Sequence, residues 1–228
     1  TRAATKLPPP PCCEPRPPPE RRGEGGRRPP DPADGENRRV RTAETMLQRT
    51  RALQHGTLVH RLLQSLPDLA AERRCEAALA YLARNAERWS EEERRALAES
   101  TLALITDARF AAVFPPGSRA EGSIVGRLEQ PGGRPTLVSG QIDRLVVTDS
   151  EVLIVDFKTN HGPPDRAAEA PRAYIRQLAL YRAILTKLYP QRQVRAALLW
   201  TETAEFMEIS ASALEAELAS LSSRRDHA

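Results

Sequence analysis

The stretch VSGQIDRLVVTDSEVLIVDFKTN, residues 138–160, holds the central pair of strands that we expect in this protein. Two runs rich in Val and Ile, residues 137–148 and 151–159, flank the polar pair Asp149 and Ser150. Two apolar runs joined by two polar residues are typical of a β-hairpin. A turn at that pair predicts that positions whose numbers sum to about 299 lie opposite each other.

This register would bring two acidic residues together. Asp143 would lie across from Asp156, with their Cβ atoms about 5 Å apart. Asp156 and Lys158 are two positions apart in one strand, so both point to the same face. Two adjacent carboxylates repel each other unless they are protonated or bridged by a cation, and Mg²⁺ prefers such oxygens. The pattern predicts a metal site with Lys158 beside it, or alternatively a surface ion pair between Asp143 and Arg144 or Lys158.

Other polar residues could extend this site. Gln177, Tyr181 and Tyr174 share one face of an expected helix, where they either contact a phosphate or base or form an ordinary polar helix edge. His60 lies within an apolar helix face, and it is either a hydrogen-bonded core residue or a ligand. Glu121 begins the first expected strand. It is either a third carboxylate of the site or a solvent-facing residue.

The first half of the chain reads as helical. Residues 42–66 carry apolar side chains at spacings of three and four, and Pro67 ends this helix. Gly56 inside it marks close packing or a helix start. A second helix is expected over residues 69–86. A third begins after Ser90, with Glu93 completing a capping box, and a short helix follows at residues 107–113.

The second half changes to strands after Pro116. Its elements predict an α/β fold, a mixed central β-sheet flanked by helices, with a helical N-terminal part. The expected elements are strands at 119–129, 137–148 and 151–159, a turn at 131–136, a helix at 172–189, strands at 194–201 and 204–210, and a helix at 211–222.

The N-terminal 40 residues differ from the rest in composition. Residues 1–40 hold 11 of the 20 prolines and almost no large apolar side chain, so we expect a disordered Pro/Arg-rich linker. Residues 41–228 then form one domain, with a helical part at 42–113 and the catalytic sheet and helices at 117–222. A linker at the start of a chain that begins with Thr suggests the C-terminal module of a larger protein.

Composition excludes several classes of protein. The formal net charge of +4 favours a nucleic-acid partner only weakly. Cys12, Cys13 and Cys75 suit neither a disulfide framework nor a four-cysteine metal site. No apolar run approaches 18 residues and no signal peptide is present, so we expect a cytoplasmic protein without a membrane-bound part.

Five segments together resemble a known family. GTLVHRLL, AEGSIVG, GQIDRL, LIVDFKTN and YIRQLALY are similar to the ordered motifs of the RecB-type nuclease module of the PD-(D/E)XK superfamily, which has a restriction-endonuclease-like fold. The likeness is greatest to the AddA-type domain, in its alphaproteobacterial form, of bacterial AddAB helicase-nucleases. It implies a Mg²⁺-dependent exonuclease that hydrolyses single-stranded DNA ends during double-strand break repair, with an AddB-like partner subunit.

The resemblance also assigns roles to residues. It implies metal ligands at His60, Asp143, Asp156 and the backbone carbonyl of Phe157; a catalytic lysine at Lys158; Gln177 and Tyr181 completing the active site on the DNA strand; and the family's first-strand acid at Glu121.

Two departures refine the resemblance. Related AddB and CRISPR-associated nucleases carry four cysteines that hold an iron-sulfur cluster, and this chain lacks them. It also lacks the phosphate-binding G-x-x-x-x-G-K-[ST] loop of an ATP-driven motor, so this piece should not unwind DNA by itself. The alternatives are a non-catalytic nuclease-like module that binds DNA or a partner, and another endonuclease of the same superfamily.

Overall fold

A computed structural model describes residues 32–129, 135–159 and 162–223. Most of the expected linker and the turn after the first strand lie outside these residues. The first helix, α1 (Pro32–Ser65), begins inside the stretch that was expected to be linker, so that part is helical instead. The chain divides into two compact units, Thr1–Thr45 and Met46–Ala228, and the sheet with its surrounding helices belongs to the second.

Three helices form the N-terminal part of this unit, as predicted. They are the end of α1, α2 (Ala71–Asn85) and α3 (Glu91–Thr106). Ser90 begins α3 through the predicted capping box: its side chain accepts from the Glu93 backbone N–H, and the Glu93 carboxylate accepts from the Ser90 backbone N–H. The expected helix after α3 is only a 3₁₀ turn, Ala108–Phe110.

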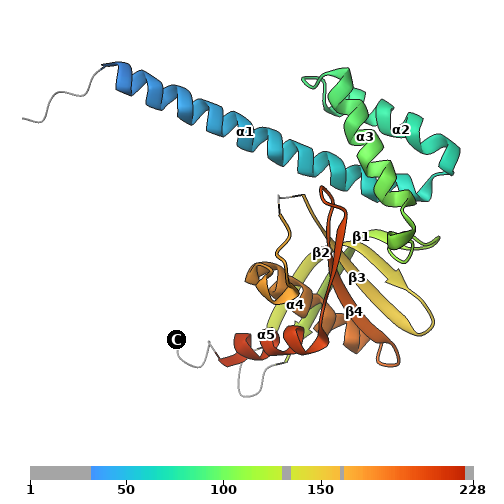
Figure 1. The fold of residues 1–228 in the computed structure, drawn as a ribbon. Helices are drawn as coiled ribbons and strands as arrows, with labels where there is room; N and C mark the ends of the chain where they lie inside the picture. The colour runs from blue at the N-terminus through green and yellow to red at the C-terminus, as the bar shows by residue number, and fades with distance from the viewer. Residues whose placement is uncertain (1–31, 130–134, 160–161, 224–228) are drawn as a thin grey trace, which may run out of the picture. The chain divides into compact units, whose positions relative to one another are not determined.

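Within the described residues, the rest of the unit is built on one five-stranded mixed sheet in the order β1-β2-β3-β4-β5, which confirms the predicted fold class (Figure 1). Only β3 and β4 pair in parallel; the other neighbours are antiparallel. The strands are β1 (Arg119–Leu128), β2 (Thr136–Val147), β3 (Glu151–Lys158), β4 (Gln193–Trp200) and β5 (Glu205–Ile209).

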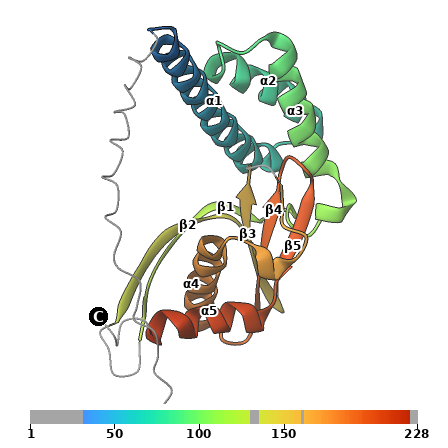
Figure 2. The ribbon, with the colours of Figure 1, turned by 60° about the vertical axis from the view of Figure 1, so that its left-hand side comes forward.

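A helix makes the crossover between the two parallel strands. This helix, α4 (Arg172–Leu188), connects β3 to β4, and α5 (Ala211–Ser223) follows β5. Parallel neighbours need such a long connection, since a tight turn reverses the chain. Both helices lie on the same side of the sheet (Figure 2). Their apolar side chains join one buried cluster with Ile124, Ile154 and Leu198.

Strand alternation sends the other residues of β3 to a second core. Leu153, Val155 and Phe157 belong to a buried cluster with apolar residues of α1, α2 and α3. The helical part and α4 therefore cover opposite faces of β3. At the end of β3, polar side chains replace apolar ones on the α4 side, and the candidate site forms there.

A buried arginine ties the helical part to the sheet. The Arg144 side chain is fully buried; it donates to the Leu63 carbonyl at 2.5 Å and to Ser118 Oγ at 3.3 Å, and it lies 5.3 Å from the Phe114 ring centroid. Burial lowers the pKa of Arg144, and the nearby charge of Asp68 counteracts this in part. The predicted alternative of a surface pair between this arginine and the neighbouring aspartate is therefore wrong.

We expect Arg144→Ala to lower the free energy of unfolding by about 2–4 kcal/mol, since the change leaves a buried carbonyl unpaired and opens a cavity. Urea unfolding followed by circular dichroism measures this loss. Arg95→Ala is the matched control, because its ion pair with Glu91 is exposed and worth less than about 0.5 kcal/mol. Equal losses in the two variants would contradict the structural role of Arg144.

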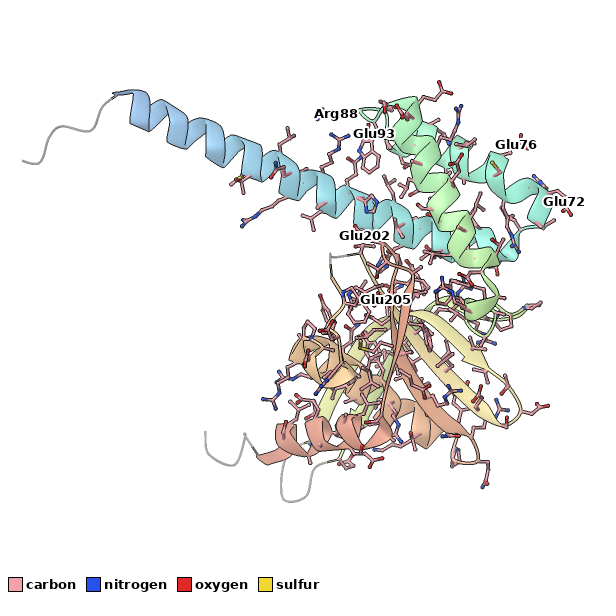
Figure 3. All side chains as sticks on the ribbon, in the orientation of Figure 1. Glu72, Glu76, Arg88, Glu93, Glu202 and Glu205 are labelled. Carbon is pink, nitrogen blue, oxygen red and sulfur yellow. The ribbon has the colours of Figure 1, made fainter. Side chains whose placement is uncertain are left out.

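The outer surface carries many charged side chains. Glu72 and Glu76 lie exposed on α2, and Arg88 lies exposed in the connection to α3 (Figure 3). Among the described residues, no helix is long and apolar enough to cross a membrane.

Candidate active site

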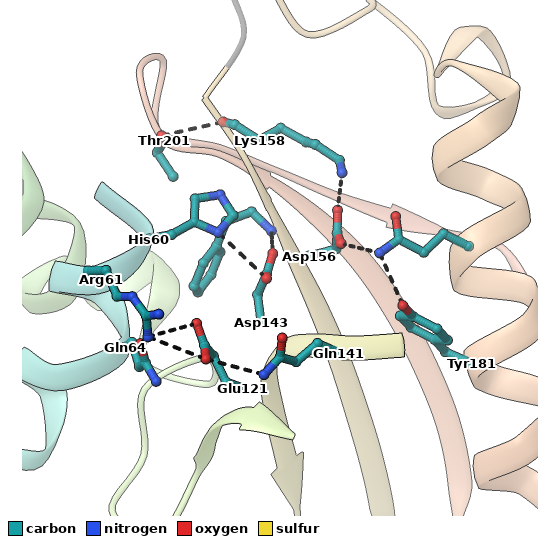
Figure 4. Close-up of polar contacts among 12 residues, drawn as sticks. His60, Arg61, Gln64, Glu121, Gln141, Asp143, Asp156, Lys158, Tyr181 and Thr201 are labelled. Carbon is teal, nitrogen blue, oxygen red and sulfur yellow. Dashed lines mark hydrogen bonds and ion pairs between the residues drawn. The ribbon is translucent and has the colours of Figure 1, made fainter. Parts of the chain in front are cut away.

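The end of β3 holds the first part of the site. Asp156 and Lys158 share a face, as strand alternation predicted, and they form an ion pair (Figure 4). Gln177 of α4 donates from Nε2 to Asp156 Oδ1 at 3.0 Å. The Asp156 residue is only 4% exposed, so its carboxylate is a buried charge held by one cation and one amide.

The second carboxylate comes from β2. The observed pairs from Arg144↔Val155 to Val147↔Val152 all sum to 299, which confirms the predicted register. Asp143 follows directly, and its Oδ2 accepts from the Phe157 backbone N–H at 2.7 Å. Asp143 is therefore anchored to β3 itself, beside Asp156.

His60 of α1 reaches this carboxylate. Its Nδ1 lies 3.6 Å from Asp143 Oδ1, and its ring meets the Phe157 ring edge-on, with 5.8 Å between centroids. Phe157 thus contributes its backbone N–H to one carboxylate and its ring to the histidine. His60 is thus largely buried and hydrogen-bonded to an acid of the predicted site, and its role as a metal ligand stays a prediction.

The electrostatics of the site follow from burial and close charges. Burial raises the pKa of Asp156, Lys158 lowers it in part, and the Asp143 carboxylate adds to the rise. Burial alone would lower the pKa of His60. The hydrogen bond and charge of Asp143, together with the charge of Asp156, raise this pKa by a larger amount, so the net shift is upward. Both groups therefore bind protons more tightly than they would in water.

The path of β2 changes beside Asp143. Ile142 and Leu145 both pack on the α4 side although they are three apart, whereas Arg144 points to the helical side. The β1–β2 ladder pairs Ala120 with Arg144 and Gly122 with Ile142, and it skips the two acids between them. Glu121 has a positive φ of 47°, an uncommon conformation for a residue with a side chain. The regular alternation of both strands is thus broken at these two acids.

Glu121 makes a separate polar cluster next to the carboxylate pair. Its oxygens lie 3.4 Å from Arg61 Nη1, and its Oε2 accepts from Gln141 Nε2 at 3.3 Å (Figure 4). Arg61 also donates to Gln64 at 2.6 Å. Glu121 thus lies near the site, but its carboxylate is paired with the Arg61 side chain. Its predicted catalytic role stays a prediction.

A polar hollow of about 400 Å³ opens beside these residues. His60 lines it together with Arg61 and Glu121, and Gly56 and Thr159 close another side. A Cβ on Gly56 would lie 2.7 Å from Thr159 Oγ1, so this glycine allows α1 to approach the end of β3. The prediction that Gly56 marks close packing is confirmed.

Tyr181 lies behind Gln177 rather than in the open. It is 8% exposed, and its Oη lies 3.5 Å from Gln177 Nε2. The ring packs against the backbone of Gly140, where a Cβ would lie 2.0 Å from the Tyr181 Oη. Tyr181 is therefore placed where it can support the side chain of Gln177. Its predicted contact with DNA stays a prediction.

We expect Gly140→Ala to push Tyr181 away from Gln177 and to lower the rate of DNA cleavage at least about tenfold, since small displacements of a catalytic group are costly. Gly122→Ala is the matched control in the neighbouring strand, because its Cβ would make only ordinary contacts, at 3.9 Å or more, with Leu145. Initial rates and thermal melting of both variants test this. A rate loss that is equal in both would contradict the support.

The candidate ligands of the site are of the chemical type that binds a hard divalent cation. Asp143 and Asp156 supply carboxylate oxygens, the ligands that Mg²⁺ prefers. In the described part of the chain, however, no group of three His, Cys, Asp or Glu side chains is arranged to hold a metal ion. The oxygens of Asp156 are engaged by Gln177 and Lys158. The predicted ligand set with His60 and the Phe157 carbonyl therefore stays a prediction.

Two contacts of the site were not predicted from the sequence. Arg61 was not singled out, although it follows His60 directly and pairs with Glu121. Tyr174 was placed on the face of Gln177, but not against Lys158, whose Nζ lies 3.9 Å from its ring centroid. For the second contact, the sequence offered one signal: Tyr174 lies three positions before Gln177, on the same helix face.

Comparison with known proteins assigns the class. The model of the PD-(D/E)XK nuclease superfamily matches residues 36–225, and the chain belongs to this superfamily. The crystal structure of SSO0001 is 13% identical, with a TM-score of 0.31, and the match covers 69% of this chain and 70% of that one. No curated protein matches the chain.

Proposed function

We propose that this chain is a metal-dependent deoxyribonuclease module that hydrolyses phosphodiester bonds of single-stranded DNA. Membership of the superfamily supports nuclease activity. The observation that carries the proposal is the convergence of Asp143 from the interior of β2 with Asp156 and Lys158 at the end of β3, with Gln177 bound to Asp156. A buried carboxylate with a raised pKa beside a lysine is typical of functional sites.

In this mechanism, Asp143, Asp156, His60 and the Phe157 carbonyl would hold Mg²⁺. The bound ion supplies charge stabilisation for the phosphate and a more acidic water. Lys158 orients the attacking water and stabilises the negative charge that develops on the phosphate.

Gln177 keeps the carboxylate of Asp156 in one orientation, because its amide donates to Oδ1. The Phe157 N–H fixes Asp143 in the same way. The two acids are therefore held in fixed positions by the backbone and by α4.

The hollow beside His60 offers room for a flexible strand next to the acids. It is lined by the ion pair of Arg61 and Glu121 and by the small residues Gly56 and Thr57. A single strand can be bound there without sequence-reading contacts. We further propose an AddA-type module that receives the strand from a helicase motor and works with an AddB-like partner in the repair of double-strand breaks.

Cleavage of labelled DNA tests the proposal. We expect the chain to degrade a linear single-stranded oligonucleotide in Mg²⁺, to stop in EDTA, and to leave a circular single strand intact if it needs an end. Asp143→Asn should lower the rate at least about 100-fold, since a positioned charge is lost. Equal rates with EDTA, or with Asp143→Asn, would exclude the proposed site.

A further inference from the structure

A tyrosine ring lies against the lysine of the candidate site. Tyr174 is on α4, and the Lys158 Nζ is 3.9 Å from the centroid of its ring. An ammonium within about 6 Å of a tyrosine ring face is attracted by the ring's electrons, and more strongly where water is excluded. The Lys158 side chain is only 13% exposed, so the contact is largely shielded from solvent.

The two contacts of Lys158 come from different elements. Its ammonium pairs with Asp156 of its own strand, and Tyr174 meets it from the helix opposite. A lysine has a long flexible stem, so one ion pair leaves its position loosely defined. A second contact from a packed helix restricts the ammonium to the region between carboxylate and ring.

We propose that Tyr174 is a positioning residue that holds the Lys158 ammonium in its reactive place. The inference rests on the proposed function, in which Lys158 acts on the water and the phosphate. An uncharged ring suits this task better than a second carboxylate would. It holds the ammonium without neutralising its charge, and it does not compete as a metal ligand.

One face of α4 then organises the two charged residues at the end of β3, Asp156 and Lys158. Tyr174, Gln177 and Tyr181 are three and four positions apart, so they lie along one face of the helix. Tyr174 meets Lys158, and Gln177 donates to Asp156 at 3.0 Å. The position of α4 against β3 therefore sets the geometry of the acid and the lysine together.

The lysine content makes this contact measurable without any activity. The chain has only three lysines, Lys6, Lys158 and Lys187. Protons over the face of an aromatic ring resonate upfield, so NMR of ¹³C-lysine-labelled protein should show one shifted ε-methylene signal, which Lys158→Met removes. We expect Tyr174→Leu to return this signal to the position of an exposed lysine and Tyr174→Phe to keep it shifted. An unmoved signal in Tyr174→Leu overturns the proposal.

Kinetics separate positioning from a structural effect. Tyr174→Leu should lower kcat on a single-stranded oligonucleotide by about 10- to 100-fold with little change in KM, and Tyr174→Phe should restore most of it. Tyr189→Leu is the control, because it removes a similar contact outside the site. There the Arg192 guanidinium lies 5.3 Å from the centroid of the Tyr189 ring. Equal loss in the Leu and Phe variants contradicts the role. If the unmodified chain cleaves no DNA, the proposed function fails, and the NMR signal still decides the Tyr174 contact.

Discussion

Lys158→Met should lower the rate of DNA cleavage by about 10³-fold or more while the fold and DNA binding remain. The ammonium is the cation of the site closest to Asp156, and its loss removes both the orientation of water and the stabilisation of developing charge. Methionine keeps the length of the side chain. Initial rates in Mg²⁺ and fluorescence anisotropy of a labelled oligonucleotide in EDTA measure the two properties separately.

The matched control is Lys187→Met. Lys187 lies near the end of α4 and donates to the Arg127 carbonyl at 3.2 Å, away from the carboxylates. The change removes the same charge from the same kind of side chain, so a general electrostatic effect on DNA would appear in both variants. A rate for Lys158→Met within about threefold of the control would rule out the catalytic role of this lysine.

The hairpin at the centre of the site could be predicted because its determinants are local. The polar pair Asp149 and Ser150 fixes the turn, and the turn fixes every later pair of the β2–β3 ladder. Alternation along β3 then places Asp156 and Lys158 on one face. Such features depend on neighbours within about 20 residues, which the sequence pattern contains.

The break of alternation at Asp143 could not be predicted in this way. It depends on Arg144, whose guanidinium donates to the carbonyl of Leu63, 81 positions earlier in the chain. An arginine between an acid and an apolar run has the pattern of an exposed residue. Only the packing of α1 on the sheet supplies the buried carbonyl that it binds.

The position of His60 lies between these cases. The sequence placed this histidine on an apolar helix face and left open whether it is a core residue or a ligand. Gly56, one turn earlier, is the local sign of the approach of α1 to the end of β3, because a side chain there would collide with Thr159. A glycine within a helix has several possible causes, however, so the sign becomes decisive only when both partners are known.

The buried acid Asp156 provides the second large effect. We expect Asp156→Asn to abolish Mg²⁺-dependent cleavage, with a loss of about 10³-fold or more, because the amide cannot replace the charge of a metal ligand or the ion pair with Lys158. Binding of Mg²⁺ to the native state should also raise the Tm of the unmodified chain, and this rise should be absent in the variant. Asp149→Asn, in the exposed turn, is the control.

Asp156→Asn should also make the free energy of unfolding less sensitive to rising pH. Burial raises the pKa of Asp156 above the 3.8 of an exposed aspartate, so the folded chain binds this proton more tightly than the unfolded chain. Stability that is present below pH 3.8 is therefore lost as the pH rises through the folded-state pKa. In EDTA, the free energy of unfolding of Asp156→Asn relative to the unmodified chain should increase over that range. A constant difference would show that Lys158 compensates the buried charge fully, and the carboxylate would then carry no stability cost in the absence of metal.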